Sequence, residues 1–288
     1  MSAVRAQGAL LLATQNADGG WPYQRGGPSW TEPTAYALLA LAGVAPAAAP
    51  VARGLQWLTA LQRPDGGWPP EASVPHSTWV TAVVALLEPA TLGTAAYRRA
   101  VAWTLRQTGA DTNAFMRLRQ WLTGDPAQHH SPGWPWFPDT SAWVTPTALS
   151  MLALRKSLRW EDLPQTRARL DMGAAYLLAH TCSDSGWNHG AARSLNHDAP
   201  SYPETTGVAL LALTGSSSPA LDKACDRAQA QLSRCRSSEA ESWLRLGLLA
   251  HGQFPQNMPC AARPARTIQN AALALLADRA AEGHNLFL

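Results

Sequence analysis

The chain has 288 residues, of which 46% are hydrophobic and 15% are charged, so it can bury a large core and is not disordered. Its formal net charge of +3 is small, and its Lys and Arg residues form no run. This charge distribution predicts no nucleic-acid partner, although it permits an acidic substrate or peripheral contact with a membrane surface.

Helical patterns follow one another along the chain with no convincing strand between them. We expect about twelve helices, at residues 3–15, 31–43, 51–62, 77–88, 94–107, 112–123, 141–155, 167–180, 204–214, 219–233, 238–251 and 264–281.

Four similar loops interrupt these helices, and each places a tryptophan six residues after a fixed point. They are Gln15–Trp21, Gln62–Trp68, Gln128–Trp134 and Thr181–Trp187, and the first two end in Asp-Gly-Gly-Trp. Glycine suits the end of a helix, and aspartate hydrogen-bonds within its own turn. We therefore expect the four tryptophans to pack between neighbouring repeats as structural residues.

Two kinds of helix alternate around these loops. The helix predicted at 51–62 is amphipathic, whereas the segment 34–41 is apolar nearly all round. A repeated array of amphipathic outer helices and apolar inner helices that closes on itself is an α/α toroid. The sequence thus predicts an all-α fold, an (α/α)6 barrel of six helix pairs, with residues 1–288 forming a single domain.

The helix count leaves two positions open. Two helical patterns lie between Thr94 and Leu122, where the repeat requires only one. The helix predicted at 264–281 has the apolar character of an inner helix but no obvious outer partner.

The starts of the inner helices collect aromatic and acidic residues at one mouth of the expected cavity. The segments 30–34 and 143–147 share one frame, and the chain before Thr81 and Thr206 follows it less strictly. The residues gathered at this mouth are Trp30, Glu32, His76, Trp79, Asp139, Trp143, Tyr202 and Glu204.

The acids at this mouth allow two interpretations. A carboxylate at a helix N-terminus is favoured by the helix dipole, so Glu32 and Glu204 can be simple caps. Alternatively, acids among aromatic rings protonate a substrate, and the ring faces stabilise a cation. Asp139 is the preferred catalytic acid because it lies nearest in sequence to three aromatic rings, with Glu32 and Glu204 as alternatives.

The Gln-x-x-Asp-Gly-Gly-Trp segments resemble the QW repeat of triterpene cyclases. At these residues the chain is similar to the superfamily of squalene–hopene cyclases and protein prenyltransferase β subunits, well over residues 4–214 and weakly beyond them. Members enclose isoprenoid chains in an aromatic-lined toroid. The resemblance implies an isoprenoid or other apolar substrate. We expect the following residues to bind this substrate: Trp30, Tyr36, His76, Trp79, Trp136, Trp143 and Tyr202.

The chain departs from both branches of this superfamily. It lacks the Asp-x-Asp-Asp acid motif of the cyclases and holds one domain where those cyclases pair two. It also lacks the Asp-x-Cys zinc ligands of the prenyltransferases, since Cys182-Ser-Asp184 is reversed. Because the cysteines at 182, 225, 235 and 260 show no ligand spacing, we expect free thiols, no metal and no other cofactor.

The sequence therefore predicts an isoprenoid-handling enzyme that uses acid-initiated cyclisation without the usual acid motif. Two alternatives stay open: a non-catalytic module that binds an apolar ligand, and a zinc-dependent prenyltransferase-like subunit that needs a partner subunit. The N-terminus shows no signal-peptide pattern, and the longest uncharged run is broken by Pro46 and Pro50, so we expect a cytoplasmic protein.

Overall fold

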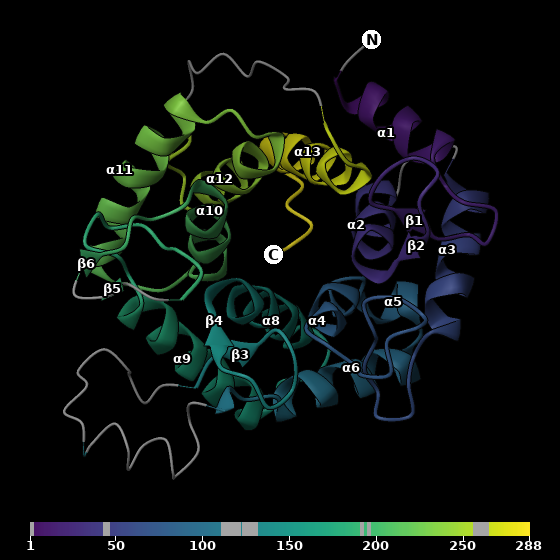
Figure 1. The fold of residues 1–288 in the computed structure, drawn as a ribbon, viewed down its shortest axis with the longest axis horizontal. Helices are drawn as coiled ribbons and strands as arrows, with labels where there is room; N and C mark the ends of the chain where they lie inside the picture. Colours follow the sequence, from purple (N-terminus) through teal and green to yellow (C-terminus); the bar gives the residue numbers. More distant parts are fainter. Residues whose placement is uncertain are drawn as a thin grey trace.

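A computed structural model gives the fold and describes residues 3–42, 47–110, 122, 132–190, 193–194, 197–255 and 265–288. The helices of this part of the chain form two concentric rings (Figure 1). The inner ring consists of α2 (Thr31–Leu41), α4 (Val80–Ala85), α8 (Val144–Ser157), α10 (Pro203–Ala212), α12 (Ser238–Ala250) and α13 (Ile268–Ala281). The outer ring consists of α1 (Ala3–Ala13), α3 (Ala48–Ala60), α6 (Thr94–Arg106), α9 (Pro164–Ala179) and α11 (Pro219–Arg234), and the short α5 (Glu88–Leu92) follows α4. The predicted all-α toroid is confirmed.

The inner ring closes on itself. Each inner helix contacts the next, and α13 contacts α2, so the last inner helix lies beside the first. The outer neighbour of α13 is α1, from the other end of the chain. The helix predicted at 264–281, for which the sequence showed no obvious outer partner, therefore packs against α1. Every residue of α2 is buried, as expected for a helix that is apolar nearly all round.

The tryptophans of the four loops are structural, as predicted. Each is at most 2% exposed, and each donates two hydrogen bonds. The indole nitrogens donate to carbonyl oxygens of the preceding outer helix at 2.7–2.8 Å. The backbone nitrogens donate to threonine hydroxyls of the following inner helix in the pairs Trp21–Thr34, Trp68–Thr81, Trp134–Thr147 and Trp187–Thr206.

The third repeat resolves the surplus helical pattern between residues 94 and 122. The indole nitrogen of Trp134 donates to the carbonyl oxygen of Thr104 in α6 at 2.8 Å, so α6 is the outer helix of this repeat. The helix predicted at 112–123 lies outside the described residues except for Leu122, and so does Gln128.

Within the residues that the structure describes, three short antiparallel pairs of strands correct the expectation of no convincing strand. They are β1 (Trp21–Pro22) with β2 (Ser29–Trp30), β3 (Trp134–Pro135) with β4 (Ala142–Trp143), and β5 (Arg193–Ser194) with β6 (His197–Asp198). In the first two, the loop tryptophan pairs with the residue just before the inner helix, Trp30 or Trp143. Two-residue strands are too short to produce an alternating sequence pattern, which is why the sequence did not reveal them.

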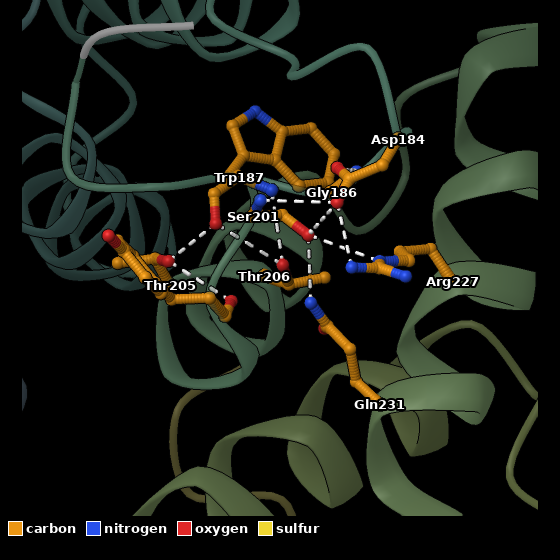
Figure 2. A network of polar contacts seen from close by, with 9 residues as sticks. Asp184, Gly186, Trp187, Ser201, Thr205, Thr206, Arg227 and Gln231 are labelled. Atoms are coloured by element: carbon orange, nitrogen blue, oxygen red, sulfur yellow. Dashed lines mark hydrogen bonds and ion pairs between the residues drawn. The ribbon is translucent and has the colours of Figure 1, made fainter. Parts of the chain in front are cut away.

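The fourth loop is tied to its neighbouring outer helix by a polar network (Figure 2). The Asp184 carboxylate accepts a hydrogen bond from the Ser201 hydroxyl at 3.0 Å and forms an ion pair with Arg227 of α11 at 2.7 Å. The amide of Gln231, one turn further along α11, donates to Ser201 at 2.8 Å. Asp184 therefore links the fourth loop to α11, which is a structural role.

Candidate active site

The loops hold the inner helices in register at one rim of the toroid. In each of four loops, the carbonyl oxygen two residues after the tryptophan accepts a hydrogen bond from the start of the neighbouring inner helix. The donor–acceptor pairs are Ile268–Tyr23 at 2.8 Å, Thr31–Pro70 at 2.9 Å, Trp79–Trp136 at 3.2 Å and Val144–His189 at 3.0 Å. The N-termini of these helices consequently meet at a common rim.

The second residue of four inner helices brings polar groups to this rim. These residues are Glu32 of α2, Glu204 of α10, Glu239 of α12 and Gln269 of α13. In the ring, α13 lies between α2 and α12, and α12 lies beside α10. Three acids and one amide from four adjacent helices thus gather where the positive ends of the helix dipoles attract negative charge.

Glu32 is the most deeply buried acid of this rim. Its side chain is 9% exposed; it accepts a hydrogen bond from the Tyr23 hydroxyl and one from the Gln269 amide at 2.8 Å. Burial raises the pKa of Glu32 to about 7, the two hydrogen bonds oppose this rise, and the charge of Glu239 adds to it. Desolvation outweighs the hydrogen bonds because the carboxylate loses bulk water. Glu32 therefore keeps its proton to a higher pH than an ordinary glutamate does.

The other two acids act electrostatically one on the next around the ring, Glu204 on Glu239 and Glu239 on Glu32. Burial and the nearby charge of Glu204 raise the pKa of Glu239, and the charge of Glu239 in turn raises the pKa of Glu32. Burial, with the charge of Glu32, also raises the pKa of Tyr23 far above its ordinary value, so its hydroxyl stays protonated as a donor. The rim can hold one proton on a carboxylic acid beside a second, ionisable carboxyl group.

Aromatic side chains also lie at the starts of the inner helices and in the tryptophan loops, and they remain partly open to solvent. The rings of Tyr23 and Trp30 lie 5.5 Å apart, and those of Trp79 and Trp136 meet edge to face at 4.7 Å. Two more sequence-predicted residues, Trp143 and Tyr202, are 39% and 41% exposed. His76 is exposed in the loop before α4.

The structure does not give Asp139 the apolar surroundings that were expected of the preferred acid. Its side chain is exposed, and its φ of 63° places it in a left-handed turn between β3 and β4. Proximity in sequence to three aromatic rings did not translate into burial, because the hairpin turn projects the residue into solvent.

Tyr36 does not line an open cavity, which corrects the interpretation of the toroid centre. The chain after α13 turns into the middle of the ring (Figure 1), where Phe287 is fully buried. The Phe287 ring lies 6.3 Å from Tyr36 and 5.4 Å from Trp243. Lys156 holds this segment by donating to the carbonyl oxygen of Leu286 at 2.7 Å.

Three residues of the candidate site were missed in the sequence: Tyr23, Glu239 and Gln269. Tyr23 follows the first loop tryptophan by two residues, which is the position that contacts the neighbouring inner helix. Glu239 and Gln269 occupy the same second helical position as Glu32. This shared position could have identified Glu239 and Gln269 as site residues. However, the last two inner helices do not follow a tryptophan loop of the kind that marks the others.

We found no candidate metal centre among the described residues. In this part of the chain, no group of three or more His, Cys, Asp or Glu side chains is placed to hold a metal ion. Cys182 and Cys225 are buried free thiols, and burial raises the pKa of both, that of Cys225 to about 11. Cys260 lies outside the described residues. None of the helices described is long and apolar enough to cross a membrane.

Comparison with known proteins relates the chain to others by fold. No protein-family profile and no curated protein sequence matches it. Among solved structures, the type II terpene cyclase MstE from Scytonema matches with a TM-score of 0.54 and 20% identity, over 99% of this chain and 78% of that chain. A GH8 endo-β-1,4-glucanase from an Achatina fulica gut metagenomic library matches with a TM-score of 0.61 and 13% identity, over 99% and 98%.

A third structure, ent-copalyl diphosphate synthase from Streptomyces platensis, matches with a TM-score of 0.53 and 18% identity, over 96% of this chain and 46% of that chain. At these identities the likeness establishes the fold alone. The chain has the α/α toroid of terpenoid cyclase-like proteins, and the GH8 glucanase has it too.

Proposed function

We propose that the chain is a single-domain enzyme in which the carboxylic acid of Glu32 gives its proton to an isoprenoid or similar apolar substrate. The observation that carries this proposal is a buried carboxyl group with a pKa of about 7 at an aromatic rim. A general acid works best when its pKa lies near the working pH.

The proposed reaction is an acid-initiated cyclisation. The O–H bond of Glu32 breaks, and the proton adds to one carbon of a terminal C=C bond while positive charge develops on the other. The resulting carboxylate is stabilised by hydrogen bonds from Tyr23 and Gln269. The ring of Trp30 supplies a face for the cation. A second C=C bond of the same chain then attacks the cation, which forms the carbon–carbon bond that closes the ring and leaves the positive charge on the far carbon of that second bond. The reaction ends when the carboxylate of Glu239 takes a proton from a carbon beside the new cation and a C=C bond forms there, so that substrate and product are isomers. Exchange of protons with water returns Glu239 to its carboxylate and Glu32 to its acid.

An isoprenoid substrate is supported by two observations. Aromatic residues of the rim, including Trp79, Trp136 and Trp143, leave part of their surface open. Among the proteins that share the fold, a single-residue variant of MstE is bound to the substrate geranylgeranyl dihydroxybenzoate. Because Phe287 covers Tyr36, the substrate would lie over the rim and not around Tyr36.

Glycoside hydrolysis is the second candidate, and the pairing of Glu32 with Glu239 favours it. Glycosidases use two carboxyl groups, one of which is a protonated acid with a raised pKa. A carboxyl group of pKa about 7 is better matched to a glycosidic oxygen than to a C=C bond, which is a far weaker base. The GH8 endo-β-1,4-glucanase with the same fold is a precedent for this chemistry on a toroid.

Incubation of the purified protein with geranylgeranyl compounds and with β-1,4-glucan oligosaccharides distinguishes these candidates. We expect a cyclised product of unchanged mass from the polyprenyl substrate, detected by mass spectrometry, and no new reducing ends from the glucan. Glu32→Gln should abolish this turnover, whereas Glu282→Gln, on an exposed acid after α13, should not.

Each other result would favour a different function. Reducing ends released from the glucan would replace the cyclase with the hydrolase. Saturable polyprenyl binding without turnover would leave a non-catalytic binding module. Stoichiometric zinc, measured by elemental analysis, would favour the prenyltransferase-like alternative, with its partner subunit.

A further inference from the structure

The last residues of the chain, 285–288, fill the centre of the ring from the end opposite the acidic rim. α13 begins at the rim and ends at Ala281, and the exposed Gly283 that follows has a φ of 91°, which lets the chain turn back into the ring (Figure 1). Three of these four residues are apolar: Leu286, Phe287 and Leu288. The phenylalanine is fully buried, and the two leucines pack against the core.

The contacts of residues 285–288 with the ring are almost entirely apolar. Within the described part of the chain, one hydrogen bond joins them to the inner ring, from Nζ of Lys156 to the Leu286 carbonyl oxygen at 2.7 Å. Their other two hydrogen bonds are internal, because the backbone nitrogens of Phe287 and Leu288 both donate to Asn285. Withdrawal of this segment would therefore break a single hydrogen bond to the ring, which water replaces.

Lys156 can lose this bond without becoming an unpaired buried charge. It is 3% exposed, lies in the last turn of α8 and also donates to the Leu86 carbonyl oxygen at 2.8 Å. Its ammonium forms an ion pair with Glu88 at 3.2 Å. Two partners thus remain when Leu286 leaves, so the large cost of isolating a buried charge does not oppose withdrawal.

The space that Phe287 fills lies next to the surroundings of Glu32. Tyr36 follows Glu32 by four residues on α2 and therefore lies one turn away on the same face. Burial raises the pKa of the Tyr36 hydroxyl well above its ordinary value, and the charges of Glu32 and Glu239 raise it further. The Tyr36 ring is also 6.3 Å from that of Phe287, so Tyr36 is shared by the acidic rim and the ring centre.

We propose that residues 285–288 form an autoinhibitory plug, which a neutral apolar chain displaces from the ring centre. With the plug in place, a substrate is confined to the rim. With the plug withdrawn, the chain of a polyprenyl substrate lies against Tyr36 and Trp243, one turn from Glu32. The ligand is neutral and apolar because the side chain that it replaces, Phe287, is a hydrocarbon ring packed on two other rings.

The inhibitory effect on turnover rests on the proposed function of Glu32, whereas occupation of the ring centre by the plug does not. A ligand that binds only when the plug is withdrawn has its apparent affinity reduced by the fraction of molecules in that state. Binding of an apolar probe therefore tests the plug without any assumption about catalysis.

Nile red, a neutral apolar dye, is titrated into the full-length protein and its fluorescence is followed. Phe287→Asp places a carboxylate in the apolar centre, so the plug should leave and the affinity for the dye should rise at least about tenfold. Phe287→Leu keeps an apolar side chain, so its affinity for the dye should stay close to that of the wild type. Thermal unfolding of both variants establishes that they are folded.

A synthetic tetrapeptide tests whether the dye occupies the place of the plug. Asn-Leu-Phe-Leu, the sequence of residues 285–288, should displace Nile red from Phe287→Asp, whereas Asn-Leu-Asp-Leu should not. Dye bound elsewhere, such as in the groove that α6 and α9 line, would be displaced by neither peptide.

Lys156→Met opens the plug by a second route that leaves Phe287 in place. This variant removes the hydrogen bond to Leu286, and Glu88 keeps its ion pair with Arg159 at 3.4 Å. Its affinity for Nile red should lie between those of the wild type and Phe287→Asp. The matched control is Lys223→Met, on an exposed lysine of α11, which should behave as the wild type. If Phe287→Asp does not fold, Lys156→Met decides.

The same variants separate the plug from the proposed function. Increased Nile red affinity with competition by Asn-Leu-Phe-Leu, but no polyprenyl turnover in any variant, would support the plug and overturn the cyclase. Turnover that depends on Glu32, with Nile red affinity unchanged in Phe287→Asp and Lys156→Met, would overturn the plug and leave the cyclase. Failure of Asn-Leu-Phe-Leu to displace the dye would also overturn the plug.

Discussion

The backbone N–H of Ile268 donates a hydrogen bond to the carbonyl oxygen of Tyr23 at 2.8 Å. This bond joins the last inner helix to the first tryptophan loop. The hydroxyl of the same tyrosine contacts Glu32, whose other partner, Gln269, is the residue next to Ile268. The environment of the candidate acid is therefore assembled by the contact that closes the ring.

Glu32 should make the stability of the fold depend on pH. The folded protein binds its proton more tightly than the unfolded chain, because burial raises the pKa from 4.5 to about 7. This stabilisation is complete below pH 4.5 and is lost as the pH rises to 7, on the order of 3 kcal/mol in all. Glu239, whose pKa is also raised, should add in the same direction.

Urea unfolding between pH 4.5 and 8 measures this effect. The wild-type free energy of unfolding should fall with rising pH, and Glu32→Gln should flatten the slope over this interval. An unchanged slope in Glu32→Gln would show that Glu32 titrates normally.

Trp68→Ala should destabilise the fold by about 3–5 kcal/mol, because it removes a fully buried ring and leaves a cavity. The comparison is Trp160→Ala, a ring that is 54% exposed, which should cost less than about 1 kcal/mol. Urea unfolding of both variants measures the difference, and similar losses would contradict the structural role of the loop tryptophans.

Gly207→Ala should separate α10 from α12. A Cβ atom on Gly207 would lie 2.3 Å from the carbonyl carbon of Trp243 and 2.4 Å from the backbone nitrogen of Leu244, so the two backbones have no room for it. We expect a loss of about 1–3 kcal/mol or more. Gly8→Ala, in α1 with no atom within 4 Å of the new methyl group, should instead gain about 0.5–1 kcal/mol. Thermal unfolding that shifts both variants in the same direction would contradict this packing.

Phe287→Ala should both weaken the fold and open the centre of the ring. The expected loss is about 3–5 kcal/mol, since the fully buried ring packs on Tyr36 and Trp243. Under native conditions the variant should also take up an apolar fluorescent dye that the wild type excludes. Phe137→Ala, on a ring that is 46% exposed, serves as the control and should do neither.

The tryptophan loops were predictable because similar residues recur at the same spacing, and each tryptophan makes the same two hydrogen bonds to its neighbouring helices. The third loop was harder to interpret, since its indole reaches back to Thr104, 30 residues earlier, where the others reach back 10. The inner position of α13 followed from its apolar character, but its contacts with α2 and with its outer partner α1 join distant parts of the chain and could not be predicted.

The site was predictable only where the repeat marks it. Glu32 and Glu204 are the second residues of recognisable inner helices, and both lie at the rim. Glu239 follows no tryptophan loop, so its place beside Glu32 emerges only in three dimensions. Tyr36 has the sequence character of a cavity wall, and nothing in its helix reveals that Phe287 fills the space opposite.

The contact between the two ends of the chain also constrains the order of events during synthesis. Arg279 of α13 donates to the Ala40 carbonyl at the end of α2, across 239 residues of sequence. A ribosome therefore completes α1 and α2 long before their partner exists, and the apolar surface of α2 must wait uncovered or be shielded by a chaperone. Until α13 emerges, Glu32 lacks Gln269 and full burial, so its carboxyl group should titrate like that of an ordinary glutamate. The raised pKa of Glu32 should therefore appear only in the final step of folding.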